Sequence, residues 1–191
     1  MPIYIIEHLE PKVFKWCLIE YKNISKIVGK DNLWFTNIKQ KSKEAKELKK
    51  YGKVIKESIA KLNLKNACVL DPDTNKTLQP NEAKKFDYFI FGGILGDYPP
   101  RKRTTPELTS KIKNAEVRNI GKNQFSTDNA VFVTKEIANG TQLGKMKFID
   151  KLTIEINNIE SIELPYSYPL VKGKPQISKE LLSYLKKKKS F

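Results

Sequence analysis

Short runs of β-branched and aromatic residues recur along the first 120 positions, and each run leads into a helical pattern or a polar loop. Runs of this kind predict strands. They cover residues 2–7, 33–36, 67–70, 88–91 and 117–120. Strands that alternate with helices at this spacing are typical of an α/β fold: a mostly parallel sheet with flanking helices. Because ligands bind beyond the carboxyl ends of such strands, we expect the functional residues in the loops that follow them.

The longest helical pattern covers residues 42–64, where apolar residues recur every three or four positions and lysines fill the opposite face. This pattern predicts an amphipathic helix. Its lysine face is either solvated surface or a contact for RNA phosphates. Further helices are predicted after Pro11, from Asn81, from Thr105 and from Ser126 to residue 138.

The C-terminal part has a different pattern. Residues 152–157 and 161–164 alternate apolar and polar side chains, which predicts a small β-hairpin. Ser178 is placed to cap a final helix that runs to Leu185. Since no linker is long enough to separate two domains, we expect a single domain over residues 1–191, with a hairpin extension at about 145–165 and a basic tail at 186–191.

The formal net charge is +15, from 36 Lys and Arg against 21 Asp and Glu, which favours polyanionic partners and RNA first among them. A lysine-rich surface without such a partner is the alternative. No apolar run approaches the roughly 20 residues of a membrane span, so we expect no membrane partner and a cytoplasmic protein. Cys17, Cys68 and the single histidine, His8, are too few for a zinc set, so we expect no metal and two reduced core thiols.

Residues 86–104 carry the strongest indication of a binding site. The segment reads FDYFIFGGILGDYPPRKRT, an apolar strand followed by glycines, an aspartate, two prolines and three cations. Glycines at the end of a strand let backbone N–H groups approach a ligand without a Cβ in the way. An ordinary Gly-Pro turn between a strand and a helix is the alternative.

Two more loops follow predicted strands, at residues 70–73 and 119–130. Together the three loops resemble the cofactor site of the SPOUT methyltransferases, which bind S-adenosylmethionine among the loops of a deep C-terminal trefoil knot. A smaller SPOUT family is more similar still; it comprises archaeal predicted RNA methyltransferases and eukaryotic ribosomal-protein arginine methyltransferases. That similarity is carried by the segments YIIEHLEP, VLDPD, FDYFIFGGILGDYPPRKRT, VRNIGKNQFSTDNAV and IELPYSYPLV. The resemblance covers nearly the whole chain and implies a SPOUT-like α/β fold with the knot, and methyl transfer from S-adenosylmethionine.

The resemblance also implies roles for loop residues. Backbone groups would hold the adenine and ribose, apolar side chains would form walls, and residues 126–129 would reach the ribose or the methionine end, or merely cap the next helix. The cofactor-binding set is Leu70, Asp71, Pro72, Gly92, Gly93, Ile94, Leu95, Gly96, Asn119, Ile120, Gly121, Phe125, Ser126, Thr127, Asp128, Asn129 and Ala130.

The catalytic set implied by the resemblance is Asp97, Arg101 and Arg103. Asp97 would contact or deprotonate the acceptor, with a turn-stabilising role as the alternative. The two arginines would bind RNA phosphate or the cofactor carboxylate, or they would form loop-fixing ion pairs. Because the sulfonium methyl is already activated, the main task of the protein is to align acceptor, methyl and sulfur.

The acceptor is left open between two classes. Ribosomal or transfer RNA comes first because of the net charge. The alternative is an arginine of a small-subunit ribosomal protein, because Asp71, Asp73, Asp97 and Asp128 lie in or beside the three loops and carboxylates suit a cationic guanidinium. A non-catalytic RNA- or ribosome-binding protein is the third interpretation. SPOUT proteins commonly pair through the knot face, so the resemblance makes a homodimer possible.

Overall fold

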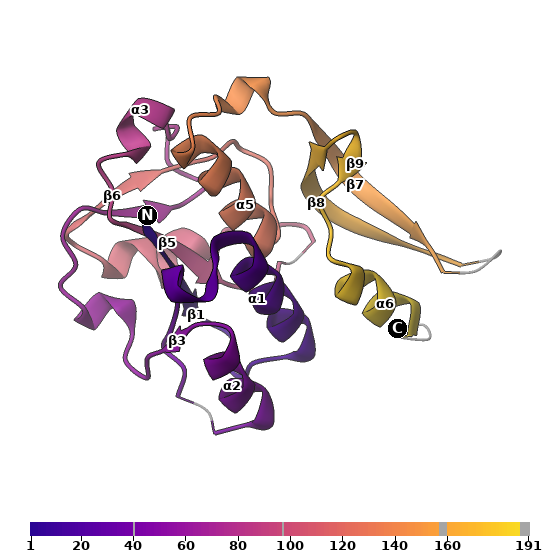
Figure 1. The fold of residues 1–191 in the computed structure, drawn as a ribbon, viewed down its shortest axis with the longest axis horizontal. Helices are drawn as coiled ribbons and strands as arrows, with labels where there is room; N and C mark the ends of the chain where they lie inside the picture. Colours follow the sequence, from indigo (N-terminus) through magenta and orange to yellow (C-terminus); the bar gives the residue numbers. More distant parts are fainter. Residues whose placement is uncertain (40, 97, 157–159, 188–191) are drawn as a thin grey trace.

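The computed structural model describes residues 1–39, 41–96, 98–156 and 160–187. Its centre is a parallel sheet of six strands in the order β3-β2-β1-β5-β4-β6 (Figure 1). The strands are β1 (Ile3–His8), β2 (Leu33–Thr36), β3 (Lys53–Val54), β4 (Ala67–Leu70), β5 (Tyr88–Gly93) and β6 (Ala115–Arg118). The expected mostly parallel α/β sheet is therefore confirmed.

Alternate residues of the central strand β1 face two different cores. Ile6 belongs to the larger core, which α1 and α5 cover, and these two helices lie side by side in Figure 1. Ile5 belongs to a smaller core on the other face, which also contains Ile59 of the short helix η3 and Leu108, the residue before the short helix η4. The helices are α1 (Lys15–Val28), η1 (Lys30–Asn32), α2 (Lys43–Glu47), η2 (Leu48–Lys50), η3 (Ile59–Lys61), α3 (Pro80–Ala83), α4 (Thr104–Glu107), η4 (Thr109–Lys111), α5 (Thr127–Ala138), η5 (Leu143–Lys145) and α6 (Lys179–Lys187).

The long helix expected over residues 42–64 is wrong. Ser42 does cap α2, but the helical stretch ends within η2, and Lys53 and Val54 then pair in parallel with Trp34 and Phe35 of β2. Gly52 makes this possible, since a Cβ there would lie only 2.6 Å from the Leu33 carbonyl oxygen. A close pass of the backbone over β2 thus overrides the helical spacing of the apolar residues.

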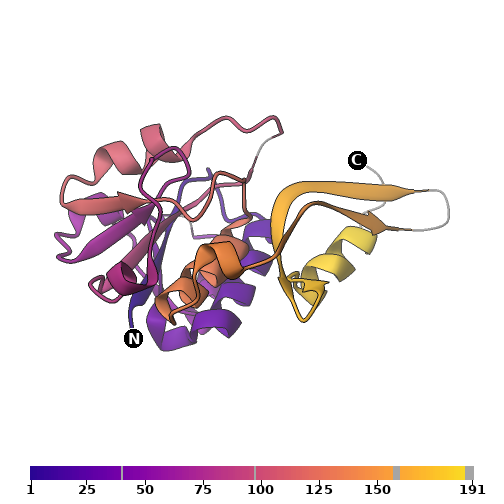
Figure 2. The same ribbon diagram turned by 90° about the horizontal axis from the view of Figure 1, so that it is seen from above.

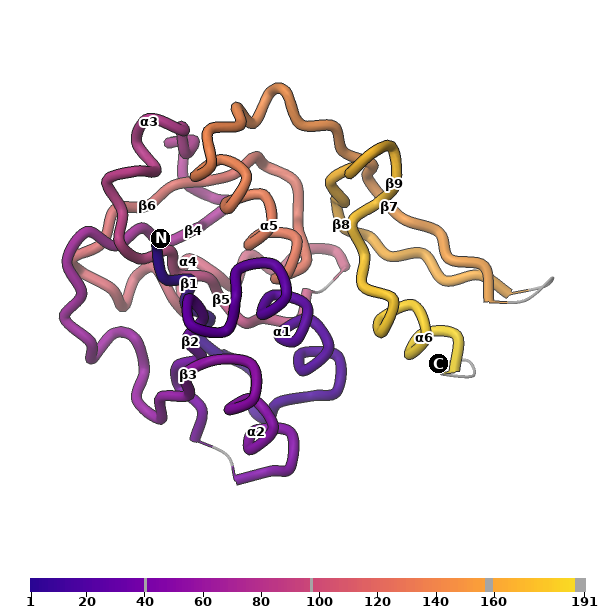
Figure 3. Tube along the Cα trace, in the orientation of Figure 1, coloured from indigo at the N-terminus to yellow at the C-terminus, as the bar shows by residue number. Residues whose placement is uncertain are grey.

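The predicted hairpin is confirmed and extends further than expected. Strands β7 (Phe148–Glu155) and β8 (Ser161–Val171) form an antiparallel sheet with β9 (Lys174–Pro175). This hairpin and α6 project from the body of the molecule, and we call residues 148–187 the arm (Figure 2). Figure 3 shows the chain leaving α5 and crossing to the arm through η5.

The arm is attached through α1. Ile19 of α1 packs in one buried cluster with Tyr168 of β8 and Leu181 of α6. Trp16 meets the Tyr184 ring edge-on at 6.3 Å, and Lys22 lies 3.2 Å from the Glu180 carboxylate. The arm is thus a packed part of the fold. Within the described residues, no helix is long and apolar enough to cross a membrane.

Candidate active site

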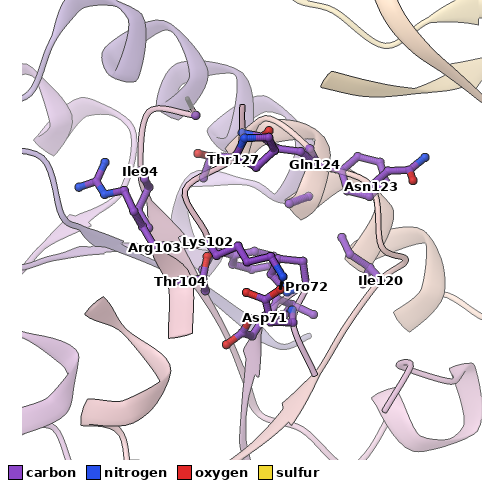
Figure 4. A pocket seen from close by; sticks show the side chains of 18 of the residues that line it. Asp71, Pro72, Ile94, Lys102, Arg103, Thr104, Ile120, Asn123, Gln124 and Thr127 are labelled. Atoms are coloured by element: carbon purple, nitrogen blue, oxygen red, sulfur yellow. Dashed lines mark hydrogen bonds and ion pairs between the residues drawn. The ribbon is translucent and has the colours of Figure 1, made fainter. Parts of the chain in front are cut away.

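A cavity of about 520 Å³ opens beyond the carboxyl ends of β4, β5 and β6 (Figure 4). Its walls come from the three loops singled out in the sequence. Most of the residues expected to bind a cofactor line it, namely Leu70, Asp71, Pro72, Gly92, Ile94, Leu95, Gly96, Ile120, Gly121, Phe125, Thr127 and Ala130. Arg101 and Arg103 also line it, whereas Asp97 lies outside the described residues.

Gly93 does not line the cavity. A Cβ there would lie 2.3 Å from the Tyr21 hydroxyl oxygen and 3.0 Å from Ile6. The Tyr21 hydroxyl in turn lies 2.9 Å from Nδ1 of the buried His8. The structure therefore gives Gly93 a packing role, since its missing side chain lets α1 approach β5.

The Gly92–Thr104 connection is held by Glu10, a residue that the sequence analysis did not single out. One oxygen of its carboxylate accepts the Leu95 N–H at 3.0 Å and Arg103 Nη1 at 2.7 Å. Arg103 also donates to both oxygens of Glu107, at 2.7 and 3.1 Å. Hydrogen bonds to Glu107 and Glu10 raise the pKa of Arg103, which keeps its charge. In Figure 4 the Arg103 guanidinium points away from the middle of the cavity, as expected for the loop-fixing alternative.

Loop 70–73 is tied to its neighbours in a similar way. The buried Asp71 carboxylate accepts hydrogen bonds from Thr105 Oγ1 at 2.8 Å and Thr109 Oγ1 at 2.6 Å, which connects the loop to α4 and η4. Asp73 lies 3.2 Å from Lys102 Nζ. Lys122 Nζ donates to the Thr74 carbonyl at 2.6 Å. The three loops therefore brace one another before any ligand arrives.

Asn119 shapes the third loop from behind the cavity. Its side-chain oxygen accepts the Thr77 hydroxyl at 3.0 Å and the Gly121 N–H at 3.1 Å, and its amide donates to the Thr74 carbonyl at 2.8 Å. Asn119 thus supports the Ile120–Gly121 turn without lining the cavity.

Ser126, Asp128 and Asn129 lie beneath the start of α5 rather than in the cavity. Asp128 accepts the Ser126 hydroxyl at 2.7 Å and the Asn23 amide at 2.8 Å. Asn129 donates to Ser126 Oγ at 2.9 Å. These side chains fix the end of α5 that presents Thr127 to the cavity.

A second buried carboxyl, Glu20, faces the same helix end. It accepts the Trp16 indole N–H at 2.7 Å. Burial, with a smaller contribution from the nearby Asp128, raises the pKa of Glu20 to about 8, although hydrogen bonds from Trp16 and Thr127 oppose the shift. Burial also raises the pKa of Asp128. Two buried acids thus lie at the junction of α1, α5 and the arm. Burial, with smaller contributions from these two acids, raises the pKa of Tyr168 in the arm.

The arm contacts two of the loops that line the cavity. The Tyr166 hydroxyl donates to the Gly96 carbonyl at 3.1 Å, and the Ser167 N–H donates to the Gln124 carbonyl at 2.8 Å. Asn123 donates to Asp150 at 2.9 Å. A Cβ on Gly96 would lie 2.6 Å from the Tyr166 ring, so this glycine permits the close contact.

The cavity fits a nucleoside-bearing cofactor such as S-adenosylmethionine. Its volume lies within the range of small-molecule pockets. Ile94, Leu95 and Phe125 supply apolar surface for a flat ring, and Gly96 and Gly121 leave backbone groups accessible. Among the described residues, no group of three or more His, Cys, Asp or Glu could hold a metal ion.

Comparison with known proteins gives a consistent result. Residues 3–190 match the family model described as protein arginine N-methyltransferase SFM1-like. The protein arginine N-methyltransferase SFM1 of Saccharomyces cerevisiae is 38% identical over 201 residues, which cover 96% of this chain and 94% of the yeast protein. The crystal structure of yeast SFM1 complexed with SAH has a TM-score of 0.87 at 33% identity and covers 96% of this chain and 94% of that chain. The complex of yeast SFM1 with SAM also gives 0.87, at 33% identity, over 97% of this chain and 90% of that chain.

A more distant likeness concerns the fold alone. The crystal structure of a dual-specific Trm10 from Thermococcus kodakaraensis has a TM-score of 0.58 at 18% identity, over 75% of this chain and 95% of that chain. Trm10 enzymes are SPOUT proteins, so the SPOUT-like fold class expected from the resemblance is confirmed.

Proposed function

This chain belongs to the SFM1-like family of protein arginine N-methyltransferases, and we propose that it methylates an arginine side chain of a protein. It is an S-adenosylmethionine-dependent methyltransferase. The family favours the protein acceptor over the RNA acceptor that the net charge puts first. We extend the proposal to a basic protein as substrate, with a small-subunit ribosomal protein as the candidate that the sequence resemblance implies.

The charge of the β7–β8 hairpin is the observation that carries this proposal. The rest of the arm, residues 172–187, contains Lys172, Lys174, Lys179, Lys186 and Lys187 against Glu180. Strands β7 and β8 with their connection contain four carboxylates, Asp150, Glu155, Glu160 and Glu163, against the single cation Lys151, although the whole chain has a net charge of +15. All five side chains are exposed. An acidic hairpin that is joined at its root to the cavity loops attracts a cationic protein segment and repels RNA phosphates.

The register of the hairpin gathers part of this charge on one face. Thr153 lies opposite Glu163, and Glu155 lies opposite Ser161, whereas the alternate residues Ile154 and Leu164 are buried. Glu155 and Glu163 therefore point to the same exposed side of the arm. The hairpin root contacts the cavity loops, so a basic segment bound along the arm can reach the cavity with one arginine.

The chemistry demands little covalent work from the protein. The bound cofactor supplies an activated methyl group, and the arginine nitrogen forms the new N–C bond as the S–C bond breaks. The guanidinium must lose one proton in this reaction. We assign its removal to Asp97, which directly follows the cavity residue Gly96 in the chain. Ile94, Leu95 and Phe125 would hold the cofactor in place and exclude water.

A labelling experiment tests the proposed acceptor. The protein is incubated with methyl-labelled S-adenosylmethionine and, in parallel, with small-subunit ribosomal proteins or with ribosomal and transfer RNA. We expect label in the protein fraction and its recovery as methylarginine after hydrolysis. Label confined to RNA would contradict the proposal. Calorimetry with S-adenosylhomocysteine provides the control, because retained cofactor binding excludes misfolding as the cause of a negative result.

A further inference from the structure

A second concave region lies on the sheet face that η3 and η4 cover. Two adjoining cavities, of about 360 and 180 Å³, share Ile59, Ala60, Lys111 and Ile112, and we call them together the η3–η4 groove. Among the described residues, none lines both this groove and the cofactor cavity. The groove is therefore separate from the cofactor cavity.

The larger cavity combines an apolar floor with a cationic rim. Leu62, Leu64 and Ile90 contribute to the floor, and Asn114 donates to the Asn63 side-chain oxygen at 3.3 Å beside it. The charged residues that line this cavity are Lys61, Lys111 and Lys113, all of them exposed. A volume of about 360 Å³ is sufficient for a small ligand. The chemistry favours a ligand with a flat apolar body and negative charges at its edge.

The smaller cavity contains two acids, but both have partners. Glu7 is buried and accepts the Ser58 hydroxyl at 2.6 Å and the Ile59 N–H at 3.0 Å. Glu107 is paired with Arg103 at 2.7 Å. Lys39 and Lys111 also line this cavity and are exposed. The lysines thus dominate the charge that the groove presents to a ligand.

The positive rim continues around the β3 edge of the sheet. We call residues 39–65 the basic edge; they include α2, η2, β3 and η3. The exposed lysines of this segment are Lys39, Lys41, Lys43, Lys46, Lys49, Lys50, Lys53, Lys56, Lys61 and Lys65. Its acids are Glu44, Glu47 and Glu57, and Glu47 lies 3.1 Å from Lys22 Nζ. Because Lys39 and Lys61 of the basic edge also line the groove, the two together fit a polyanion longer than one nucleotide.

We propose that the η3–η4 groove and the basic edge bind single-stranded RNA, with phosphates on the lysines and a base on the apolar floor. Every base has a flat face that packs on apolar surface, and the amides of Asn63 and Asn114 match the polar edge of a base. An anionic membrane is a poorer fit, because the large exposed apolar residues of the described chain are Met1, Tyr98, Ile149 and Val171, none of which lies in the groove or the basic edge. The RNA is a docking partner and not the methyl acceptor.

The test compares two variants with the same change of charge. Lys61, Lys111 and Lys113 are replaced by glutamate in the groove variant, and Lys30, Lys84 and Lys145, exposed elsewhere, are replaced by glutamate in the control. Binding of a fluorescent single-stranded RNA of about 12 nucleotides is followed by anisotropy between about 50 and 200 mM salt. Methylation of the protein substrate by each variant reports whether it is folded.

We expect salt-dependent binding by the unchanged protein and a loss of more than about tenfold in the groove variant, whose slope of log K against log salt falls by roughly two. The control variant should change affinity by less than about twofold. An equal loss of RNA affinity in both variants would show that RNA is attracted by the overall positive charge and not by the groove. Absence of binding at low salt would also overturn the proposal. If poly-glutamate displaces the RNA at equal charge concentration, the groove binds an acidic protein segment instead, and the proposal is likewise wrong.

Discussion

The β7–β8 hairpin and the basic edge carry opposite charge on one small molecule. The hairpin exposes four carboxylates against Lys151, whereas the basic edge exposes lysines on the side of the molecule where the sheet ends in β3 (Figure 1). The net charge of +15 sums every surface of the chain and describes neither of these two. The difference teaches that the net charge of a chain is a poor guide to the substrate of an enzyme. The charge of the surface near the active site is the better guide.

The largest expected effect concerns the carboxylate that we assign to the acceptor. An Asp97→Asn variant should lose at least about a hundredfold in kcat, because an amide cannot accept the guanidinium proton. Binding of S-adenosylhomocysteine, measured by calorimetry, should stay unchanged. Normal turnover by this variant would show that Asp97 does not take the guanidinium proton.

The charge of the β7–β8 hairpin can be reversed. A Glu155→Lys, Glu163→Lys double variant should raise KM for a basic protein substrate about tenfold with little change in kcat, because it repels a cationic segment before the reaction starts. The matched control replaces two exposed acids distant from the arm, Asp31 and Glu57, by lysine. Equal effects in the two variants would mean that only the net charge matters, and the contrast between the two surfaces would fail.

The contact between arm and cavity is tested at Gly96. A Gly96→Ala variant places a Cβ against the Gln124 amide nitrogen and 2.6 Å from the Tyr166 ring. It should lower kcat/KM by about fivefold, because Gln124 and the arm both have to shift. RNA binding at the basic edge should remain unchanged. Gly144→Ala is the control, since its Cβ would meet nothing within 4 Å. An unchanged kcat/KM in the Gly96 variant would show that the arm can move without lowering catalytic efficiency.

The smallest expected effect on activity lies at the junction of body and arm. Because burial raises the pKa of Glu20 to about 8, the folded protein keeps a proton that the unfolded chain loses near pH 4.5. The free energy of unfolding should therefore fall as the pH rises from about 5 to 8. Glutamine does not titrate, so the Tm of a Glu20→Gln variant relative to the unchanged protein should increase by roughly 10 °C over the same range.

Thermal unfolding monitored by circular dichroism at several pH values checks this expectation. The exposed Glu57→Gln change serves as the control and should show no such trend. A Tm difference between the Glu20 variant and the unchanged protein that stays constant with pH would mean that Glu20 is ionised in the fold.

Most of the sheet could be predicted from the sequence, because its signal is local. Residues 33–36 and 67–70 are short, mainly apolar runs, and both are strands with the expected bounds. The helix predicted over residues 42–64 is wrong because the conformation of that segment depends on a contact distant in sequence, between Gly52 and the Leu33 carbonyl oxygen. The spacing of apolar residues within one stretch of sequence carries no information about that contact.

The candidate site could also be predicted only in part from the sequence. The three loops and their glycines could be found because each follows a strand. The actual partners of Arg103 and Asp71 could not, because Glu10 and the threonines of α4 and η4 belong to other segments of the chain. One signal was available for Glu10, since it follows β1 at the same edge of the sheet as the loops it supports.

The single carboxylate of Glu10 has a mechanical consequence. It holds the amide of Leu95 near the start of the Gly92–Thr104 connection and the guanidinium of Arg103 near its end. One side chain thus holds the cavity wall at two places. Loss of Glu10 would remove the contact to Leu95 and leave Arg103 with Glu107 as its partner.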